Sequence, residues 1–213
     1  MIITIDGPAA SGKSSAAQLL AHKFSYYYMY TGLLYRALGY ILVNYYKFTD
    51  QPDMLLLEKI LLNLEYSYDT HAGITIKFNT INITQHLKTA EIDRLASIIS
   101  EHPQVRLLLL DYQRKLAHAH NLVADGRDCG TIVFPQANFK FFLTASATVR
   151  AERWQKNQAQ YTLQESVRII QERDERDSNR AVAPLCQAPD AIIIDNSKLT
   201  LMETLTCIEH YII

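Results

Sequence analysis

The sequence predicts an α/β fold in which helices flank a parallel β-sheet. A strand-like run from Ile2 to Asp6 leads through a glycine-containing turn into a helical pattern from Lys13 to Phe24. Strand-like runs recur further along and are separated by helical stretches, an alternation typical of parallel sheets. These later runs are Asn121 to Ala124, Phe139 to Leu143 and Ala191 to Ile194. The chain of 213 residues is 48% apolar, which suffices for one domain with a sizeable core.

The elements at the two ends of the chain follow from apolar spacing. In the first helix, one apolar face is expected to contain Ala16, Leu19, Leu20 and Phe24. The cluster Tyr26 to Tyr28 favours a half-buried strand over a platform for stacking bases. The last helix is expected to pack on the sheet through residues at helical spacing, namely Leu201, Leu205, Ile208 and Ile212.

The pattern changes between residues 50 and 100. A helix is predicted from about Pro52 to Leu64, followed by short alternating runs typical of strands. These runs lie at residues 65–68, 73–78 and 81–83. We therefore expect an insert with its own strands.

Composition narrows the class of partner and the compartment. The 21 lysine and arginine residues nearly balance the 22 aspartate and glutamate residues, so no global positive field predicts a nucleic-acid or membrane partner. Three irregularly spaced cysteines fit neither a disulfide framework nor a zinc site. The absence of a basic leader and of a long apolar run predicts a cytoplasmic protein with no membrane segment. Any anion site must be local, and seven of the eleven arginines fall between Arg127 and Arg180.

The first chemical signal is the run Gly7 to Ser14, which fits the G-x-x-x-x-G-K-[ST] phosphate loop in full and joins a predicted strand to a predicted helix. Its backbone N–H groups and the helix N-terminus would hold phosphates, Lys13 would reach the β and γ phosphates, and Ser14 would ligate Mg²⁺. The expected ATP-binding residues are Gly7, Pro8, Ala9, Ala10, Ser11, Gly12, Lys13, Ser14 and Ser15. Kinases, GTPases and mechanical ATPases all share this loop, so it does not identify the acceptor.

The second signal is the charged run from Arg173 to Arg180, near the end of a predicted helix. Residues 173, 176, 177 and 180 share one face of that helix. By itself the run is typical of a solvated helix with ion pairs between successive turns. Beside a phosphate loop, guanidinium groups are also suited to hold two phosphates close together without repulsion.

Two further polar stretches accompany the loop. Residues 124–131 form a glycine-flanked stretch at the carboxyl end of a predicted strand, where open α/β sheets place their ligands. Thr31 and Arg36 lie about one helical turn apart and could grip an acceptor phosphate. A helix N-cap followed by a surface arginine explains this last pair equally well.

Together these four stretches resemble bacterial-type cytidylate kinases, the P-loop nucleoside monophosphate kinases that phosphorylate CMP and dCMP. The ordered marks span almost the whole chain: Ile5 to Pro8, Thr31-Gly32 with Tyr35-Arg36, Gly126 to Asp128 with Gly130-Thr131, and Arg173-Asp174 through Leu185. The resemblance implies transfer of the γ-phosphoryl group of ATP to CMP or dCMP, giving CDP or dCDP and ADP, with Mg²⁺. It implies one P-loop kinase domain, 1–213, and a monomer whose partners are small molecules.

The resemblance also implies how the domain is divided. The core would comprise residues 1–30, 101–150 and 163–213. Residues 31–100 would form the acceptor-binding region with its strand-bearing insert, and residues about 151–162 a short lid that closes over ATP. Arg153 and Arg150 are the lid-side candidates for contact with the ATP phosphates.

Site roles are carried over residue by residue. The expected catalytic residues are Lys13, Arg127, Arg173 and Arg180. The acceptor phosphate would bind Thr31, Arg36, Arg127 and Arg180, the ribose and phosphate would bind Arg173 and Asp177, and Tyr35 would line the acceptor site. Cytosine would be read by Ser97, Arg106 and Asp128, because a carboxylate accepts from the exocyclic amine of cytosine but faces the carbonyl oxygen of uracil.

The chain departs from the family pattern at four places. One of them is the lid segment from Asn157 to Gln160, which replaces a segment that usually includes glycine. Tyr30 stands where an acidic residue usually precedes the threonine, Trp154 follows Arg153 where two arginines are common, and Cys129 replaces a methionine. Two alternative functions are a kinase of the same architecture with another small acceptor, and a nucleotide-dependent switch. The three cytosine-reading residues argue against the first, and the lack of a guanine-reading Asn-Lys-x-Asp argues against the second.

Overall fold

A five-stranded parallel sheet forms the centre of the computed structural model, which describes residues 1–47, 53–156 and 158–212. The strand order is β2-β6-β1-β7-β8, and every neighbouring pair is parallel. The strands are β1 (Ile2–Asp6), β2 (Tyr27–Tyr30), β6 (Leu122–Gly126), β7 (Phe139–Thr144) and β8 (Ile192–Asp195). The predicted α/β class and parallel sheet are confirmed.

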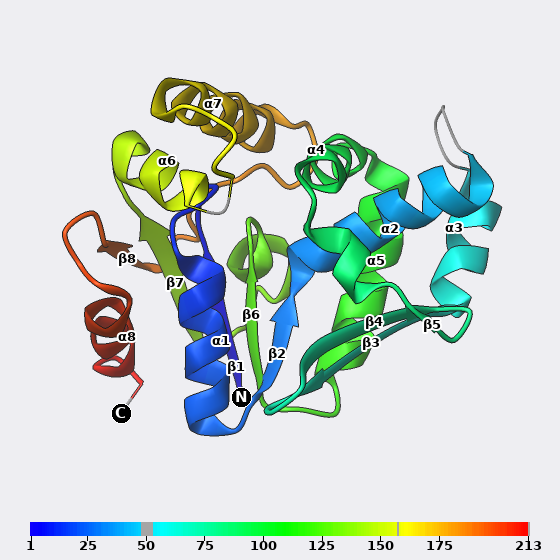
Figure 1. Cartoon of the computed structure of the whole chain (residues 1–213). Helices are drawn as coiled ribbons and strands as arrows, with labels where there is room; N and C mark the ends of the chain where they lie inside the picture. The colour runs from blue at the N-terminus through cyan, green and yellow to red at the C-terminus, as the bar shows by residue number, and fades with distance from the viewer. Residues whose placement is uncertain (48–52, 157, 213) are drawn as a thin grey trace.

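Helices cover both faces of this sheet (Figure 1). On one face, α1 (Lys13–Phe24) and α8 (Leu201–Glu209) bury apolar side chains against β1, β7 and β8. On the other face, α5 (Pro103–Ala117) and a short π-helical turn, η2 (Cys129–Val133), pack against β2 and β6. The split follows from the two-residue period of a strand, which sends Ile3 and Ile5 to the α1 side and leaves Thr4 on the other.

Three apolar predictions at the chain ends need correction. Leu201, the first residue of α8, is 40% exposed and does not join the apolar core against the sheet. Leu19 is 37% exposed, because the buried stripe of α1 runs through alanines and Leu20 and points Leu19 away from the sheet. Ile212 packs against the same core although α8 ends at Glu209, so it is partly buried without being helical.

The insert is a separate antiparallel sheet beside the β2 edge of the central sheet (Figure 1). Its strands β3 (Leu64–Asp69), β4 (Gly73–Phe78) and β5 (Ile81–Asn82) match the predicted runs to within two residues. The helix expected before them is α3 (Met54–Leu62), and the predicted start at Pro52 lies outside the described residues. Together with α2 (Thr31–Tyr46), a 3-10 turn η1 (Thr84–Lys88) and α5, the insert encloses the largest apolar cluster.

Three helices complete the site side of the molecule. These are α4 (Ala90–Ile99), α6 (Ala147–Gln155) and α7 (Leu163–Asn179). Figure 1 places α6 and α7 side by side above the carboxyl ends of the sheet strands, with α4 next to α7. The predicted lid, residues about 151–162, corresponds to the second half of α6 and the connection from α6 to α7. Asn157, in this connection, lies outside the described residues. Within the described part of the chain, none of the helices combines the length and the apolar character needed to cross a bilayer.

Candidate active site

The predicted phosphate loop joins β1 to α1 at the carboxyl edge of the sheet. Gly7 has φ +152°, and a Cβ there would lie 2.1 Å from the carbonyl oxygen of Leu143, so only glycine fits. Gly12 has φ +88° and is the N-cap residue of α1, which turns the loop into the helix. The loop is therefore shaped by backbone requirements that the two glycines meet.

Lys13 lies inside the loop with 5% of its surface exposed. Its Nζ donates a 2.9 Å hydrogen bond to the carbonyl oxygen of Pro8. Burial lowers the pKa of the Lys13 ammonium, and the nearby Arg127 guanidinium lowers it further. The negative charge of a bound polyphosphate would raise this pKa again, so the site favours an anionic ligand.

Ser14 is connected to a carboxylate on the neighbouring strand. Its Oγ donates a 2.6 Å hydrogen bond to Oδ2 of Asp125, and the Tyr28 hydroxyl donates a 2.8 Å bond to Oδ1 of the same carboxylate. Asp125 is fully buried, and burial raises its pKa although Lys13 and both hydrogen bonds lower it. Asp125 was absent from the sequence-based site, although the stretch 124–131 contains it as the first carboxylate.

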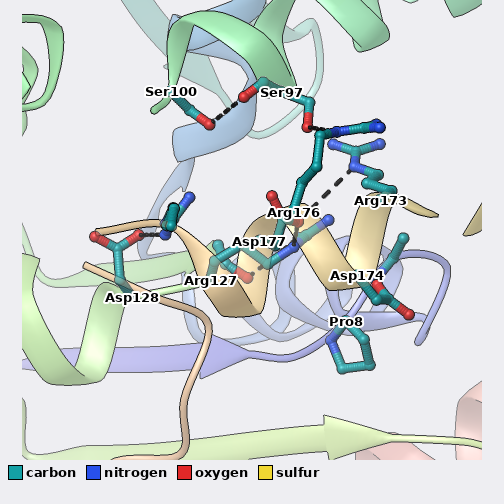
Figure 2. Close-up of polar contacts among 12 residues, drawn as sticks. Pro8, Ser97, Ser100, Arg127, Asp128, Arg173, Asp174, Arg176 and Asp177 are labelled. Carbon is teal, nitrogen blue, oxygen red and sulfur yellow. Dashed lines mark hydrogen bonds and ion pairs between the residues drawn. The ribbon is translucent and has the colours of Figure 1, made fainter. Parts of the chain in front are cut away.

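The arginines of α7 and of the loop after β6 converge on one acidic residue. Arg127 Nε donates a 2.8 Å bond to Oδ2 of Asp177, and Arg173 Nε lies 3.9 Å from the same oxygen (Figure 2). Asp177 is only 4% exposed, and Arg127 and then Arg173 lower its pKa despite its burial. The interpretation of this run as a solvated helix surface is therefore wrong for its inner face.

The residues predicted to read cytosine lie close together behind these arginines. Asp128 is ion-paired through Oδ2 with Arg106, and its Oδ1 accepts a 3.3 Å bond from Arg180. Ser97 Oγ accepts a 3.3 Å bond from Arg176, as Figure 2 shows, and does not contact Asp128 directly. Tyr35 lies under Arg106, with the guanidinium 5.5 Å from the ring centroid. Arg180 also donates to the carbonyl oxygen of Ala183, which fixes the end of α7.

At the start of α2, Thr31 is buried and Arg36 is only partly exposed, so the pair is not a helix cap followed by a surface arginine. Thr31 is the first residue of α2, and its hydroxyl donates a 2.8 Å bond to the carbonyl oxygen of Asp125. Arg36 donates to the carbonyl oxygen of Leu87 and to Asp93, which the sequence did not single out. The alternative of an N-cap and an exposed arginine is therefore wrong.

The predicted lid arginines hold the outside of the phosphate loop. Arg153 donates to the carbonyl oxygens of Ser11 and Asn196, at 3.3 and 2.9 Å, and so lies against the loop. Arg150 donates to the carbonyl oxygen of Ala9 and pairs with Asp174, a carboxylate that also accepts a 2.9 Å bond from the Ala9 N–H. In this conformation Arg150 supports the loop and is not free to touch phosphates.

One cavity of about 540 Å³ brings these groups together. Most of the predicted site residues line it, including Ala9, Ala10, Gly12, Lys13, Ser14, Ser15, Thr31, Tyr35, Arg36, Ser97, Arg106, Arg127, Asp128, Arg153, Arg173, Asp177 and Arg180. Gly7, Pro8 and Ser11 form the loop from behind and do not line the cavity. The phosphate loop and the Arg106–Asp128 ion pair thus line the same cavity.

Comparison with known proteins agrees with this arrangement. The family described as cytidylate kinase matches residues 3–212. The chain belongs to the cytidylate kinase family. It is 39% identical to the cytidylate kinase of Halalkalibacterium halodurans, covering 100% of this chain and 97% of that protein. It is also 39% identical to the cytidylate kinase of Marinomonas sp., covering 97% of this chain and 93% of that protein.

A solved structure supports the fold alone. An uncharacterized protein from Eubacterium ventriosum aligns over 100% of this chain and 98% of its own, with a TM-score of 0.55 and 13% identity. The family match and the relatives confirm, at the level of the family, the cytidylate kinase resemblance seen in the four sequence stretches.

Proposed function

We propose that the protein transfers the γ-phosphoryl group of ATP to CMP, and also to dCMP, giving CDP or dCDP and ADP. The observation that carries this proposal is the single cavity in which Lys13 of the phosphate loop and the Arg106–Asp128 pair form part of the same lining. The family membership and the relatives named cytidylate kinase support the same acceptor.

The chemistry needs positioning more than proton transfer. The acceptor phosphate of CMP is already ionised, so its oxygen attacks the γ phosphorus directly while the bond to the ADP oxygen breaks. Lys13 would bind the β and γ phosphates, and Arg127, Arg173 and Arg180 would hold the transferred group and the acceptor in line. The cost of bringing two anions together is thus offset by cations that Asp177 and Asp128 already orient.

Ser14 and Asp125 are the residues that fit Mg²⁺. Their oxygens lie 2.6 Å apart at the start of α1 beside Lys13, and hydroxyl and carboxylate oxygens are the donors this cation prefers. The ion would neutralise charge on the β and γ phosphates when ATP is bound. Asp125 holds the Ser14 hydroxyl in place for that contact.

Base selection would depend on Asp128. With both of its oxygens engaged by arginines, the carboxylate is fixed in orientation. Approach of the cytosine amine adds a donor to this group, whereas the O4 of uracil would bring two acceptors together. We assign Ser97 and Tyr35 to the same pocket and Thr31 and Arg36 to the acceptor phosphate.

We also propose that the domain is divided into a core, an acceptor-binding region and a lid. The core is residues 1–30, 101–150 and 163–213, the acceptor region 31–100, and the lid about 151–162. We further propose a monomer acting in the cytoplasm on small nucleotides.

A direct assay tests the activity. The purified protein is given ATP and Mg²⁺ with CMP, dCMP, UMP, AMP or no acceptor, and ADP production is followed. We expect turnover with CMP and dCMP well above the other acceptors. Slow ATP hydrolysis that no nucleoside monophosphate stimulates would instead favour a nucleotide-dependent switch.

A further inference from the structure

We infer that Asp93 is a positioning residue that holds Arg36 and Arg173 in the geometry needed to bind the acceptor phosphate. The inference rests on the proposed function, because it concerns how that site recognises the phosphate of its acceptor. Asp93 lies in the first turn of α4, and its carboxylate lines the cavity that contains the phosphate loop.

Asp93 bridges two arginines that come from distant parts of the chain. Its Oδ1 accepts from Nη2 of Arg36 at 2.5 Å, and its Oδ2 accepts from Nη1 of Arg173. Arg36 lies on α2 and Arg173 on α7, so one carboxylate on α4 connects three helices. The two arginines and the carboxylate are each only partly exposed, with 16 to 22% of their side-chain surfaces accessible.

The connection holds Arg36 from two sides and leaves one donor of Arg173 without a partner. Arg36 uses its Nη1 on the carbonyl oxygen of Leu87, which fixes the plane of the guanidinium from a second side. Among the described residues, Arg173 Nε is buried and has no hydrogen-bond partner, with Asp177 3.9 Å away. A buried donor without a partner is costly, and an anionic oxygen in the cavity would satisfy it.

The position next to Thr31 supplies no charge to this arrangement. Residue 30 is a tyrosine, and the Arg36 guanidinium lies 5.9 Å from its ring centroid, a contact that orients the cation without neutralising it. Asp93 is therefore the carboxylate that balances Arg36. Arg173, Arg36 and then Arg127 lie close enough to keep its pKa below the ordinary aspartate value, although burial opposes them.

Without the carboxylate of Asp93, the positive charges of Arg36 and Arg173 would move apart. Arg36 and Arg173 repel each other across a cavity that also contains Arg127, and long arginine side chains have several rotamers. A planar carboxylate that accepts from both of them fixes their separation and their donor directions. Asp93 should therefore matter for recognition of a phosphate and should not matter for recognition of the base.

The test compares a ligand that has the phosphate with one that lacks it. Binding of CMP and of cytidine is measured by calorimetry for the wild type, for Asp93→Asn and for a matched control, Glu91→Gln. Glu91 is in the same turn of α4 and is exposed, so its replacement removes one negative charge without touching the arginines. A second variant, Asp93→Ser, is measured in the same way in case Asp93→Asn does not fold. The comparison uses a variant that unfolds cooperatively and is therefore folded.

We expect the wild type and Glu91→Gln to bind CMP much more tightly than cytidine. In Asp93→Asn the ratio of the two affinities should fall by about tenfold or more, with cytidine affinity changed less than about twofold. The KM for CMP should rise in the same proportion while the KM for ATP stays within about threefold of the wild type.

Three results would overturn the inference. Unchanged or tighter CMP binding by Asp93→Asn would mean that the carboxylate competes with the substrate phosphate and does not prepare its site. Equal losses for CMP and cytidine would mean a general structural role. A wild type that binds CMP no better than cytidine and shows no CMP-stimulated turnover would overturn the proposed function itself, a failure distinct from the first two.

Discussion

The hydroxyl of Ser14 donates a 2.6 Å hydrogen bond to the carboxylate of Asp125, which connects the phosphate loop to the strand beside it. The two residues are 111 positions apart in the sequence, and the parallel pairing of β1 with β6 brings their strand ends together. The Mg²⁺ site proposed above therefore depends on one contact between adjacent strands.

Replacing Asp125 with asparagine should weaken the response to Mg²⁺. The amide keeps the shape of the side chain but loses its charge, so the concentration of Mg²⁺ for half-maximal turnover should rise by about tenfold or more. Initial rates measured across a Mg²⁺ titration test this. Tyr28→Phe removes only one hydrogen bond to the same carboxylate and should change that concentration by less than about threefold. An unchanged titration in Asp125→Asn would contradict the assignment.

Replacing Asp128 with asparagine should narrow the preference for CMP over UMP. An asparagine amide can turn either its oxygen or its nitrogen toward the base, so the ratio of kcat/KM values for CMP and UMP should fall by about tenfold or more. The rate with CMP should fall as well, because Arg106 and Arg180 lose their shared partner. Asp111→Asn, on the exposed side of α5, serves as the control and should leave the ratio unchanged. A ratio equal to that of the wild type would contradict the proposed role.

ATP binding should take up a proton at Lys13. Burial and Arg127 lower the pKa of this ammonium to about 7, whereas bound phosphates favour its charged form. Near pH 7 the uptake should be roughly half a proton per ATP bound. Calorimetry in buffers with different ionisation enthalpies measures the number of protons taken up. Arginine stays protonated, so the Lys13→Arg variant should show only the proton uptake that comes from ATP itself. Equal uptake by both proteins would exclude Lys13 as its source.

The buried carboxylate of Asp6 should make folding stability depend on pH. Asp6 accepts hydrogen bonds from the backbone N–H groups of Cys129 and Gly130, yet burial raises its pKa from 3.8 to about 6. Because the folded-state pKa lies above the unfolded one, the stability contribution of protonated Asp6 is complete below about pH 4 and is lost as the pH rises through 6. Between pH 4 and 7 the wild type should lose about 2–3 kcal/mol relative to Asp6→Asn.

Urea unfolding of both proteins at a series of pH values checks this prediction. The difference between the two curves isolates Asp6 from other titrating groups. Parallel curves for the wild type and Asp6→Asn would show that its two backbone hydrogen bonds outweigh its burial.

Patterns local in the sequence predicted most of the fold. Glycine positions, apolar periods and the alternation of strands and helices located the sheet strands to within two residues, because these signals reflect local backbone geometry. Leu19 was assigned to the wrong side of α1, since a helix with several alanines leaves the exact direction of its buried stripe undetermined by spacing alone.

The sequence predicted the basic residues of the site more completely than its acidic residues. Lys13 and Arg127 stand in recognisable motifs, whereas Asp93 and Asp125 act by pairing with side chains that only the fold brings near. Asp125 had one usable signal, its place at the end of a strand inside a polar stretch. Asp93 had none, because a single carboxylate at the start of an amphipathic helix is equally typical of a favourable charge at a helix N-terminus.

The position of β1 in the middle of the sheet has a consequence for how the chain folds. Its neighbours are β6 and β7, so Ile3 pairs with Val123 and Phe139, partners that a ribosome produces more than a hundred residues later. The antiparallel hairpin of β3 and β4 involves far shorter separations and can form as soon as it is made. The phosphate loop is therefore synthesised first but takes its final shape only after β6 and β7 have closed around β1, so an incomplete chain cannot yet build the site.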